Sequence, residues 1–305
     1  MILVVTHKTD FTTDFVIEKF NTKKIKYFRF NCEEINLINY KYSLFDTQEL
    51  HIGSSNQYSA VWFRRTMLPP PSPQLSYAEN NFILQSYRCL LDNFFTLLNT
   101  KWLSHPENIT KAENKLFQLK AAKEIGFQIP LTMVTNKKDL IQPFFDSCKC
   151  NVIIKPIYIG RIESKNEMQL LFANKIKKEH IEKLGEFDLT PCIFQEFIEK
   201  ELDIRVTVVD NSIFAASIDS QLDIETSVDW RRKKMKFAPY KLPAIIENKC
   251  IELTKKLGLS FGAIDIVKSI NGEYFFLEIN PNGQWAWIEI DTGLRISDAI
   301  INFLN

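Results

Sequence analysis

The stretch FGAIDIVKSINGEYFFLEIN, residues 261–280, decides the fold of this chain. Two apolar runs flank Asn271-Gly272, and this dipeptide strongly predicts a β-hairpin because both residues tolerate a positive φ. If the turn is symmetric about the dipeptide, Asp265 lies directly opposite Glu278. Their Cβ atoms would be about 5 Å apart on one face of the sheet, where two negative charges repel by roughly 3 kcal/mol. A purely structural hairpin would avoid this pair, so it indicates a functional site.

A divalent cation would remove the repulsion between the two carboxylates. Asn280 follows Glu278 by two residues, so it points to the same face and offers a neutral oxygen. Asp, Glu and Asn oxygens without Cys or His are the ligands that Mg²⁺ prefers in proteins. The sequence therefore predicts a magnesium site at Asp265, Glu278 and Asn280. The alternative is a solvated polar strand face, which the apolar neighbours disfavour.

The overall composition is that of an ordinary globular protein. Charged residues make up 25% of the 305 residues, hydrophobic residues 45%, and the formal net charge is +1. A nearly neutral chain does not favour nucleic acid or a membrane surface as its partner. The apolar N-terminal run is too short for a signal peptide, and no segment reaches the roughly 20 apolar residues that span a bilayer. The six scattered cysteines indicate reduced thiols, so we expect a cytoplasmic protein.

Alternating apolar patterns along the chain predict an α/β fold made of α+β lobes. We expect an N-terminal α/β domain over residues 1–105, a central lobe over 106–197 and a C-terminal lobe over 198–305. The expected helices cover 11–20, 77–98, 111–126, 167–184 and 244–257, and the second of them is expected to close the first lobe. The expected strands cover 2–5, 58–65, 131–135, 151–156, 192–199, 204–210, 212–219 and the hairpin.

Five segments occur in the order and spacing of the ATP-grasp superfamily: NKLFQLKAAKEIGFQIPLT, VIIKP, IFQEFIEKELDIRVTVV, FGAIDIV and FFLEINPNGQW. The chain resembles that superfamily through them, which implies an ATP-grasp fold preceded by a pre-ATP-grasp domain. The implied cofactors are ATP and Mg²⁺, and the implied metal ligands are those that the hairpin predicts. Lys115 and Lys155 would bind the nucleotide phosphates, although either lysine alone would be an ordinary surface charge. Arg205 would face the terminal phosphate, where a guanidinium stabilises developing charge.

The same resemblance assigns the adenosine side of the site. Glu196, Phe197 and Ile198 would form the hinge whose backbone binds adenine, and Glu199 or Asp203 would lie near the ribose.

Two segments depart from the superfamily pattern. The phosphate loop is usually rich in glycine, whereas IYIGRIESKN offers only Gly160, so Arg161 is a candidate contact. Related ligases often carry an arginine in the strand that corresponds to IFAASIDSQ, and this chain has none. Arg231, in DWRRKKMKF, is the candidate substitute and a candidate catalytic residue.

Further segments resemble a narrower group, the peptide-modifying ATP-grasp ligases of microviridins and graspetides, including grasp-with-spasm maturases. They are MILVVTHKTDFTTDFVIEKF, AVWFRRTMLPP, WLSHPENITKAENKLFQLKAAKEIGFQIPLTMVTN and VDWRRKK. This resemblance implies macrocyclisation of a ribosomally made precursor peptide, which is the expected partner, and a homodimer. Asp or Glu side chains of the peptide would be phosphorylated by ATP and then attacked by hydroxyls or amines.

An acidic peptide needs a local cationic surface on a nearly neutral protein. Arg64, Arg65 and Arg232 are the candidate substrate-binding residues. The alternatives are an ion pair at the strand end for the first two and a solvated loop for the third. Two rival functions remain: an ATP-grasp ligase that adds amino acids to a protein tail or joins small metabolites, and a nucleotide-binding regulator without catalysis.

Overall fold

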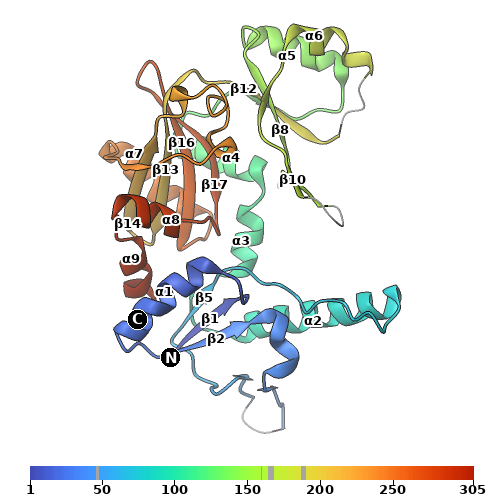
Figure 1. Ribbon diagram of the computed structural model, residues 1–305, viewed down its shortest axis with the longest axis vertical. Helices are drawn as coiled ribbons and strands as arrows, with labels where there is room; N and C mark the ends of the chain where they lie inside the picture. Colours follow the sequence, from blue (N-terminus) through green and yellow to red (C-terminus); the bar gives the residue numbers. More distant parts are fainter. Residues whose placement is uncertain (46–47, 159, 164–167, 187–189) are drawn as a thin grey trace.

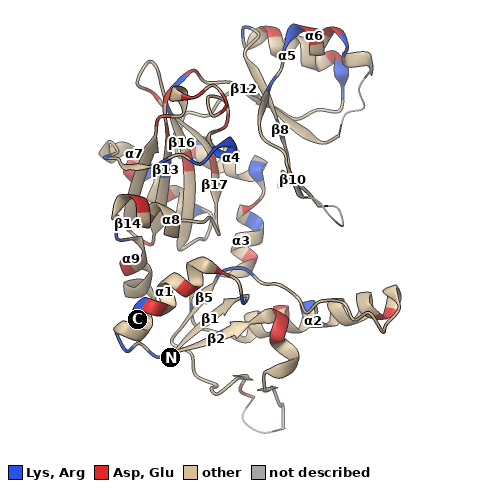
Figure 2. Cartoon of the chain, in the orientation of Figure 1, with Lys and Arg blue, Asp and Glu red and all other residues tan. Residues whose placement is uncertain are grey.

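The computed structural model describes residues 1–45, 48–158, 160–163, 168–186 and 190–305, without the side chains of residues 161, 163, 168 and 186. Three main sheets carry the described part of the chain, and short hairpins extend from two of the lobes (Figure 1). Acidic and basic residues are interspersed over all three regions (Figure 2), and the formal net charge is +1. None of the described helices combines the length and apolar character needed to cross a membrane.

The N-terminal sheet is parallel, with strand order β2-β1-β5-β6. All five residues of β1 are buried because elements cover both faces, as is usual for a parallel sheet. A short hairpin, β3 with β4, and a 3₁₀ helix over Cys32–Leu37 lie beside it. The bounds are β1 Ile2–Thr6, α1 Phe11–Thr22, β2 Tyr27–Asn31, β3 Tyr40–Lys41, β4 His51–Ile52, β5 Ala60–Phe63, α2 Tyr77–Leu97 and β6 Lys101–Leu103.

Helix α2 differs from its expected role. Ser76 and Glu79 form a capping box at its start, and the helix has the predicted length. Its buried residues, however, all lie near its C-terminal end: Leu91, Phe94 and Phe95. Its N-terminal half extends away from the body of the molecule (Figure 1), so α2 closes the first lobe only with its last turns.

The helix expected over 111–126 is two helices. α3 spans Pro106–Ala112, and α4 spans Lys115–Glu124. Asn114 lies between them with an extended backbone, so the chain turns there and Lys115 becomes the first residue of a new helix. Gly126, at φ +82°, ends α4 as predicted.

The central sheet has the strand order β11-β8-β12-β7, with all neighbouring strands antiparallel. The expected helix over 167–184 is wrong: most of its described residues form strands or loop, and only a short α6 remains. The bounds are β7 Thr132–Met133, α5 Ile141–Ser147, β8 Val152–Pro156, β9 Arg161–Glu163, β10 Met168–Leu170, β11 Asn174–Lys175, α6 Lys178–Glu182 and β12 Cys192–Glu196; β9 and β10 pair in a separate hairpin.

The C-terminal sheet is antiparallel, with strand order β15-β14-β13-β16-β17. Helix α9 returns to the first lobe, where it packs against α1, β5 and β6 (Figure 1). The bounds are β13 Lys200–Val209, β14 Ser212–Ile218, β15 Ala238–Pro239, α7 Ala244–Lys256, β16 Phe261–Ser269, β17 Tyr274–Asn280, α8 Ala286–Thr292 and α9 Ile296–Leu304.

The hydrophobic cores join the first and last sheets. One buried cluster runs from Leu3 and Phe30 through α4 to Ile204 and Phe276, and a second joins Val4 to Ile300. The central sheet has a smaller cluster of its own, around Phe145. We keep the division into 1–105, 106–197 and 198–305 as a proposal, in which the first and third parts share a core and the central part can move more independently.

Candidate active site

In the β16–β17 hairpin Asp265 pairs directly with Glu278, as predicted, but the turn that leads to this pairing is not the predicted one. The turn is not the symmetric two-residue turn: the Ser269 N–H donates to the Glu273 carbonyl, which leaves a three-residue loop ending in Gly272 at φ +82°. This loop shifts the register by one residue. A β-bulge at Leu277 shifts it back before the acidic pair.

Three charged residues form a row across the C-terminal sheet. Arg205 on β13 is the register partner of Asp265, which is the partner of Glu278. Arg205 Nη1 donates to Asp265 Oδ2 at 2.7 Å, and the two side chains are 9% and 16% exposed. Arg205 Nε is buried without a hydrogen-bond partner among the described residues. Because directly paired residues of neighbouring strands point to the same face, this row faces one side of the sheet.

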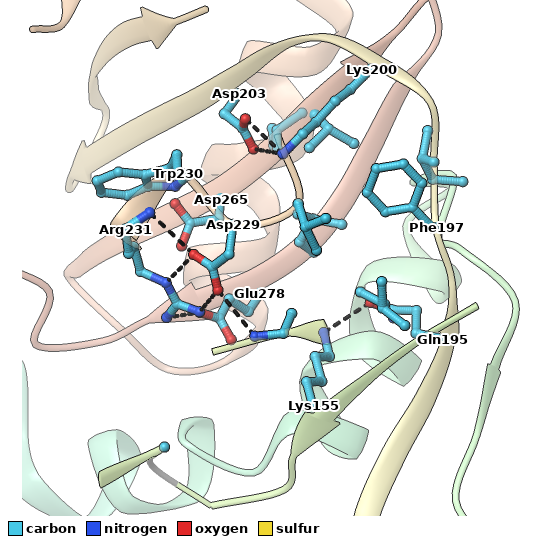
Figure 3. A pocket seen from close by; sticks show the side chains of 18 of the residues that line it. Lys155, Gln195, Phe197, Lys200, Asp203, Asp229, Trp230, Arg231, Asp265 and Glu278 are labelled. Carbon is cyan, nitrogen blue, oxygen red and sulfur yellow. Dashed lines mark hydrogen bonds and ion pairs between the residues drawn. The ribbon is translucent and has the colours of Figure 1, made fainter. Parts of the chain in front are cut away.

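A pocket lies between this row and the central sheet (Figure 3). Lys155, from β8, lines the central-sheet side, and its ammonium donates to Gln195 Oε1 at 2.9 Å. Lys115, at the start of α4, lies 3.4 Å from Glu278 Oε2. The predicted phosphate lysines and the acidic pair are therefore brought together in one cavity. In the segment that corresponds to the phosphate loop, Gly160 lines the pocket. The side chain of Arg161, the other candidate contact, lies outside the described residues.

The charges in the pocket shift each other's pKa values. Burial raises the pKa of Asp265, although Arg205 partly offsets it. Burial also opposes ionisation of Glu278, but Lys115, Lys155 and Arg231 outweigh it and hold its pKa at about 2. Burial lowers the pKa of Lys155 to about 8, against the attraction of Glu278. The pocket thus holds an ionised Glu278 at neutral pH and a lysine that titrates near the physiological range.

The predicted hinge follows β12 and lines the pocket through Glu196, Phe197 and Ile198. Two of its N–H groups are used by the protein: Glu196 donates to the Leu131 carbonyl and Phe197 to the Asn151 carbonyl. The Ile198 N–H has no hydrogen-bond partner among the described residues, so it is available to a ligand.

The structure separates the two ribose candidates. Asp203 lines the pocket and is buried, with Lys200 Nζ at 2.8 Å and Ser220 Oγ donating to it. Glu199 is exposed and lies outside the pocket lining. Lys200 was not singled out from the sequence. A lysine two residues past the hinge gives no sign by itself that it will be buried.

Arg231 lines the pocket and is held there by Asp229, a residue that the sequence analysis missed. Its guanidinium donates to both oxygens of Asp229, from Nε at 2.8 Å and from Nη2 at 2.7 Å, and it approaches Glu278 at 4.0 Å. This bidentate hydrogen bonding to Asp229 raises the pKa of Arg231. Figure 3 shows Asp229 and Arg231 facing each other beside Glu278. The i, i+2 spacing of these two residues was the available signal.

The three predicted substrate-binding arginines have different surroundings. Arg64 is 2% exposed and pairs with Asp10, so the structure supports the ion-pair alternative. Arg65 is exposed and lies near Glu113. Burial raises the pKa of Glu113, and the charge of Arg65 offsets only part of this effect. Arg232 does not line the pocket; it bonds instead to residues of the central lobe.

The donor set at the end of the hairpin fits a hard cation. Asp265 and Glu278 oppose each other, and Asn280, two residues on, is half-buried. Among the described residues no group of three or more His, Cys, Asp or Glu side chains gathers as a metal site, so a zinc-type cluster has no support. Two carboxylates with a neighbouring amide are suited to Mg²⁺ that takes its other ligands from water and phosphate.

Known proteins match this chain over most of its length. Residues 111–304 match the model of the RimK-like ATP-grasp domain. A RiPP-associated ATP-grasp ligase from Chryseobacterium gregarium, solved in complex with ADP and a leader and core peptide, is 28% identical, with a TM-score of 0.90 over 99% of this chain and 96% of that one. The macrocyclase MdnC of Microcystis aeruginosa, bound with its precursor peptide MdnA, is 29% identical, with a TM-score of 0.87 over 100% and 99%.

Sequence relatives carry a different name. A probable alpha-L-glutamate ligase from Shewanella pealeana is 25% identical over 222 residues, which are 70% of this chain and 46% of that protein. The chain thus spans about half the length of this relative. The expected ATP-grasp fold of mixed helices and sheets is confirmed. On the match to residues 111–304, the chain belongs to the RimK-like ATP-grasp family.

Proposed function

We propose that this chain is an ATP-dependent ligase that forms intramolecular ester or amide bonds in a ribosomally made precursor peptide. The observation that carries the proposal is the end-to-end likeness to a peptide-bound ligase, at 28% identity over 99% of the chain. This likeness includes the N-terminal sheet and α2, which lie outside the residues matched by the family model.

The reaction has two balanced steps. A peptide carboxylate oxygen attacks the terminal phosphorus of ATP, ADP leaves, and an acyl phosphate forms. A Ser or Thr hydroxyl or a Lys amine of the same peptide then attacks the carbonyl carbon, loses its proton and expels inorganic phosphate. Lys155 and Lys115 would hold the phosphates, while Arg205 and Arg231 would stabilise the charge on the phosphoryl and carbonyl oxygens.

Asp265, Glu278 and Asn280 would hold Mg²⁺, which supplies charge neutralisation for the transferred phosphoryl group. The Ile198 N–H, which has no hydrogen-bond partner among the described residues, supports adenine recognition by the hinge. Asp203, which lines the same pocket, would bind the ribose.

The peptide would approach from the exposed side of the pocket. The Arg231 side chain is 51% exposed there, and Arg65 adds a second exposed cation. The six cysteines are free thiols, in line with a cytoplasmic enzyme. In the homodimer that the resemblance implies, the exposed apolar half of α2 is a candidate contact surface.

The test is incubation of the purified chain with MgATP and the small peptide encoded next to its gene. Macrocyclisation predicts the loss of one water mass per ring, with one ADP formed for each. Glu278→Gln is the matched inactive control. An unchanged peptide mass, with the peptide shown to bind, would refute the proposal.

The names of the sequence relatives favour a second candidate, the addition of glutamate to a peptide or protein. The same mass analysis separates the two: added glutamyl mass with free glutamate present supports this candidate and contradicts ring formation.

A further inference from the structure

A long connection between β14 and β15 leaves the C-terminal sheet and contacts the central lobe. We call residues 219–233 the strap. The strap is tied to its own lobe at two points. Near its start, Ser220 Oγ donates to Asp203 on β13. Near its end, the Trp230 ring packs against Phe237 and Trp287, with centroids 5.2 and 6.0 Å away.

The strap contacts the central lobe around Ala173, whose backbone N–H and carbonyl are both hydrogen-bonded to the strap. The Ala173 N–H donates to Asp229 Oδ2 at 3.3 Å, and its carbonyl accepts from Arg232 Nη2 at 2.8 Å. Arg232 Nη2 also donates to Asn174 Oδ1 at 2.7 Å, and its guanidinium lies 5.3 Å over the Phe172 ring. Ala173 and Asp229 are buried at 8% and 6% exposure, so the contact is enclosed.

The position of this contact matters because the hinge joins the same two lobes covalently and lies on the other side of β8. In the central sheet, β8 lies between β11 and β12. The hinge continues from β12, whereas Ala173 immediately precedes β11. The strap and the hinge therefore link the lobes on opposite sides of β8, the strand that carries Lys155. Ala173, Asp229 and Lys155 all line the pocket.

One carboxylate serves both the lobe contact and the candidate catalytic arginine. Asp229 Oδ1 accepts from the Arg231 N–H and Nε, and Oδ2 accepts from Arg231 Nη2 and the Ala173 N–H. If the lobes separate at Ala173, Asp229 loses one of its donors, and the carboxylate that orients Arg231 toward Glu278 is freed to move. Figure 3 shows Asp229 between the Arg231 guanidinium and Glu278.

We propose that Asp229 and Arg232 form a clasp on Ala173 that holds the two lobes closed over bound nucleotide, and that Asp229 is the positioning residue for Arg231. Arg232 is then a closing residue and not a peptide-binding one. This proposal requires only that nucleotide binds between the lobes, so it can be tested independently of peptide macrocyclisation.

The first experiment measures the release of mant-ADP from the full chain by stopped-flow fluorescence. Arg232→Ala removes the charged donor of the clasp, and we expect release to become about tenfold faster, the effect of losing one charge-assisted hydrogen bond. Arg88→Ala, an exposed arginine of α2 outside the pocket lining, is the matched control with unchanged release. Equal release from Arg232→Ala and wild type, with equal melting temperatures, would overturn the clasp.

The second experiment separates closing from positioning. Asp229→Ala should both speed mant-ADP release and lower the kcat of ADP formation, whereas Arg231→Ala should lower kcat by a larger factor than it speeds release, because the bonds of Asp229 and Arg232 to Ala173 remain. The double variant should lose far less kcat than the product of the two single losses, because Asp229 acts on catalysis through Arg231. Multiplied losses would contradict the positioning role. Asp229→Asn, which keeps one acceptor for Ala173, replaces the alanine variant if that variant does not fold; it should keep slow release and still lose kcat.

Discussion

The titration of Lys155 predicts how nucleotide affinity depends on pH. Its ammonium is held inside the pocket by Gln195, and burial lowers its pKa to about 8. If phosphate binds only the charged form, the apparent Kd rises by the factor 1 + 10^(pH − pKa). From pH 7 to pH 9 this factor grows from about 1.1 to about 11, a tenfold loss of affinity or about 1.4 kcal/mol. An unperturbed lysine, titrating near 10.4, would change the affinity by only about 4% over the same range.

The assay is a fluorescence titration with mant-ADP at several pH values, without added metal. Lys155→Arg is the matched control, because a guanidinium stays charged over the whole range. The reasoning would be refuted by a flat profile in the wild-type chain, or by a wild-type slope that persists in Lys155→Arg.

Three further outcomes are expected. Glu278→Gln keeps the shape of the side chain but removes a metal ligand, so MgATP turnover should fall by about 100-fold while the chain remains folded. An enzyme-coupled ADP assay measures the turnover and circular dichroism checks the fold; wild-type turnover would remove the metal assignment. Asp10→Ala leaves Arg64 charged and buried without its ion-pair partner, so urea unfolding should show that the free energy of unfolding falls by about 3–5 kcal/mol. Asp14→Ala, at an exposed position, should lower it by less than about 1 kcal/mol. Equal losses in the two variants would contradict the account of the buried pair. Gly272→Ala meets no atom within 4 Å but must keep φ +82°, so it should cost about 1–2 kcal/mol of stability from backbone strain alone, and a neutral effect would show that the loop relaxes.

Local patterns were sufficient for the most apolar strands, but they did not reveal β2, β6 or β11. The apolar runs of β1, β8, β13 and β16 predict buried strands because a short run of consecutive apolar residues is favoured where both faces of the strand are covered. The opposed acidic pair was predicted correctly although the turn was not, because the three-residue loop and the bulge at Leu277 cancel each other in the register, and the sequence pattern shows neither of them. The roles of the individual site residues stay predictions until the variants are measured.

Other features depend on contacts distant in sequence. The stretch over 167–184 is charged enough for a solvated helix, yet part of it pairs with β8 as β11, because tertiary pairing overrides weak helix propensity. The apolar spacing of α2 predicts a helix but cannot say which turns find a core. Arg64 looks like its exposed neighbour in sequence, and only the arrival of Asp10 makes it a buried ion pair.

The three-residue loop and the bulge at Leu277 affect the placement of Glu278 differently. The loop lies outside the ladder, so shortening it would leave Ser269 paired with Glu273 and every residue of β17 on its present face. The bulge inserts one residue between the pairs Ile266–Phe276 and Asp265–Glu278, and such an insertion bends the strand and increases its local twist. Deleting Leu277 would straighten β17 beside the acidic pair and re-aim the carboxylate of Glu278, so we expect loop length to vary more freely than the bulge wherever the acidic pair is retained.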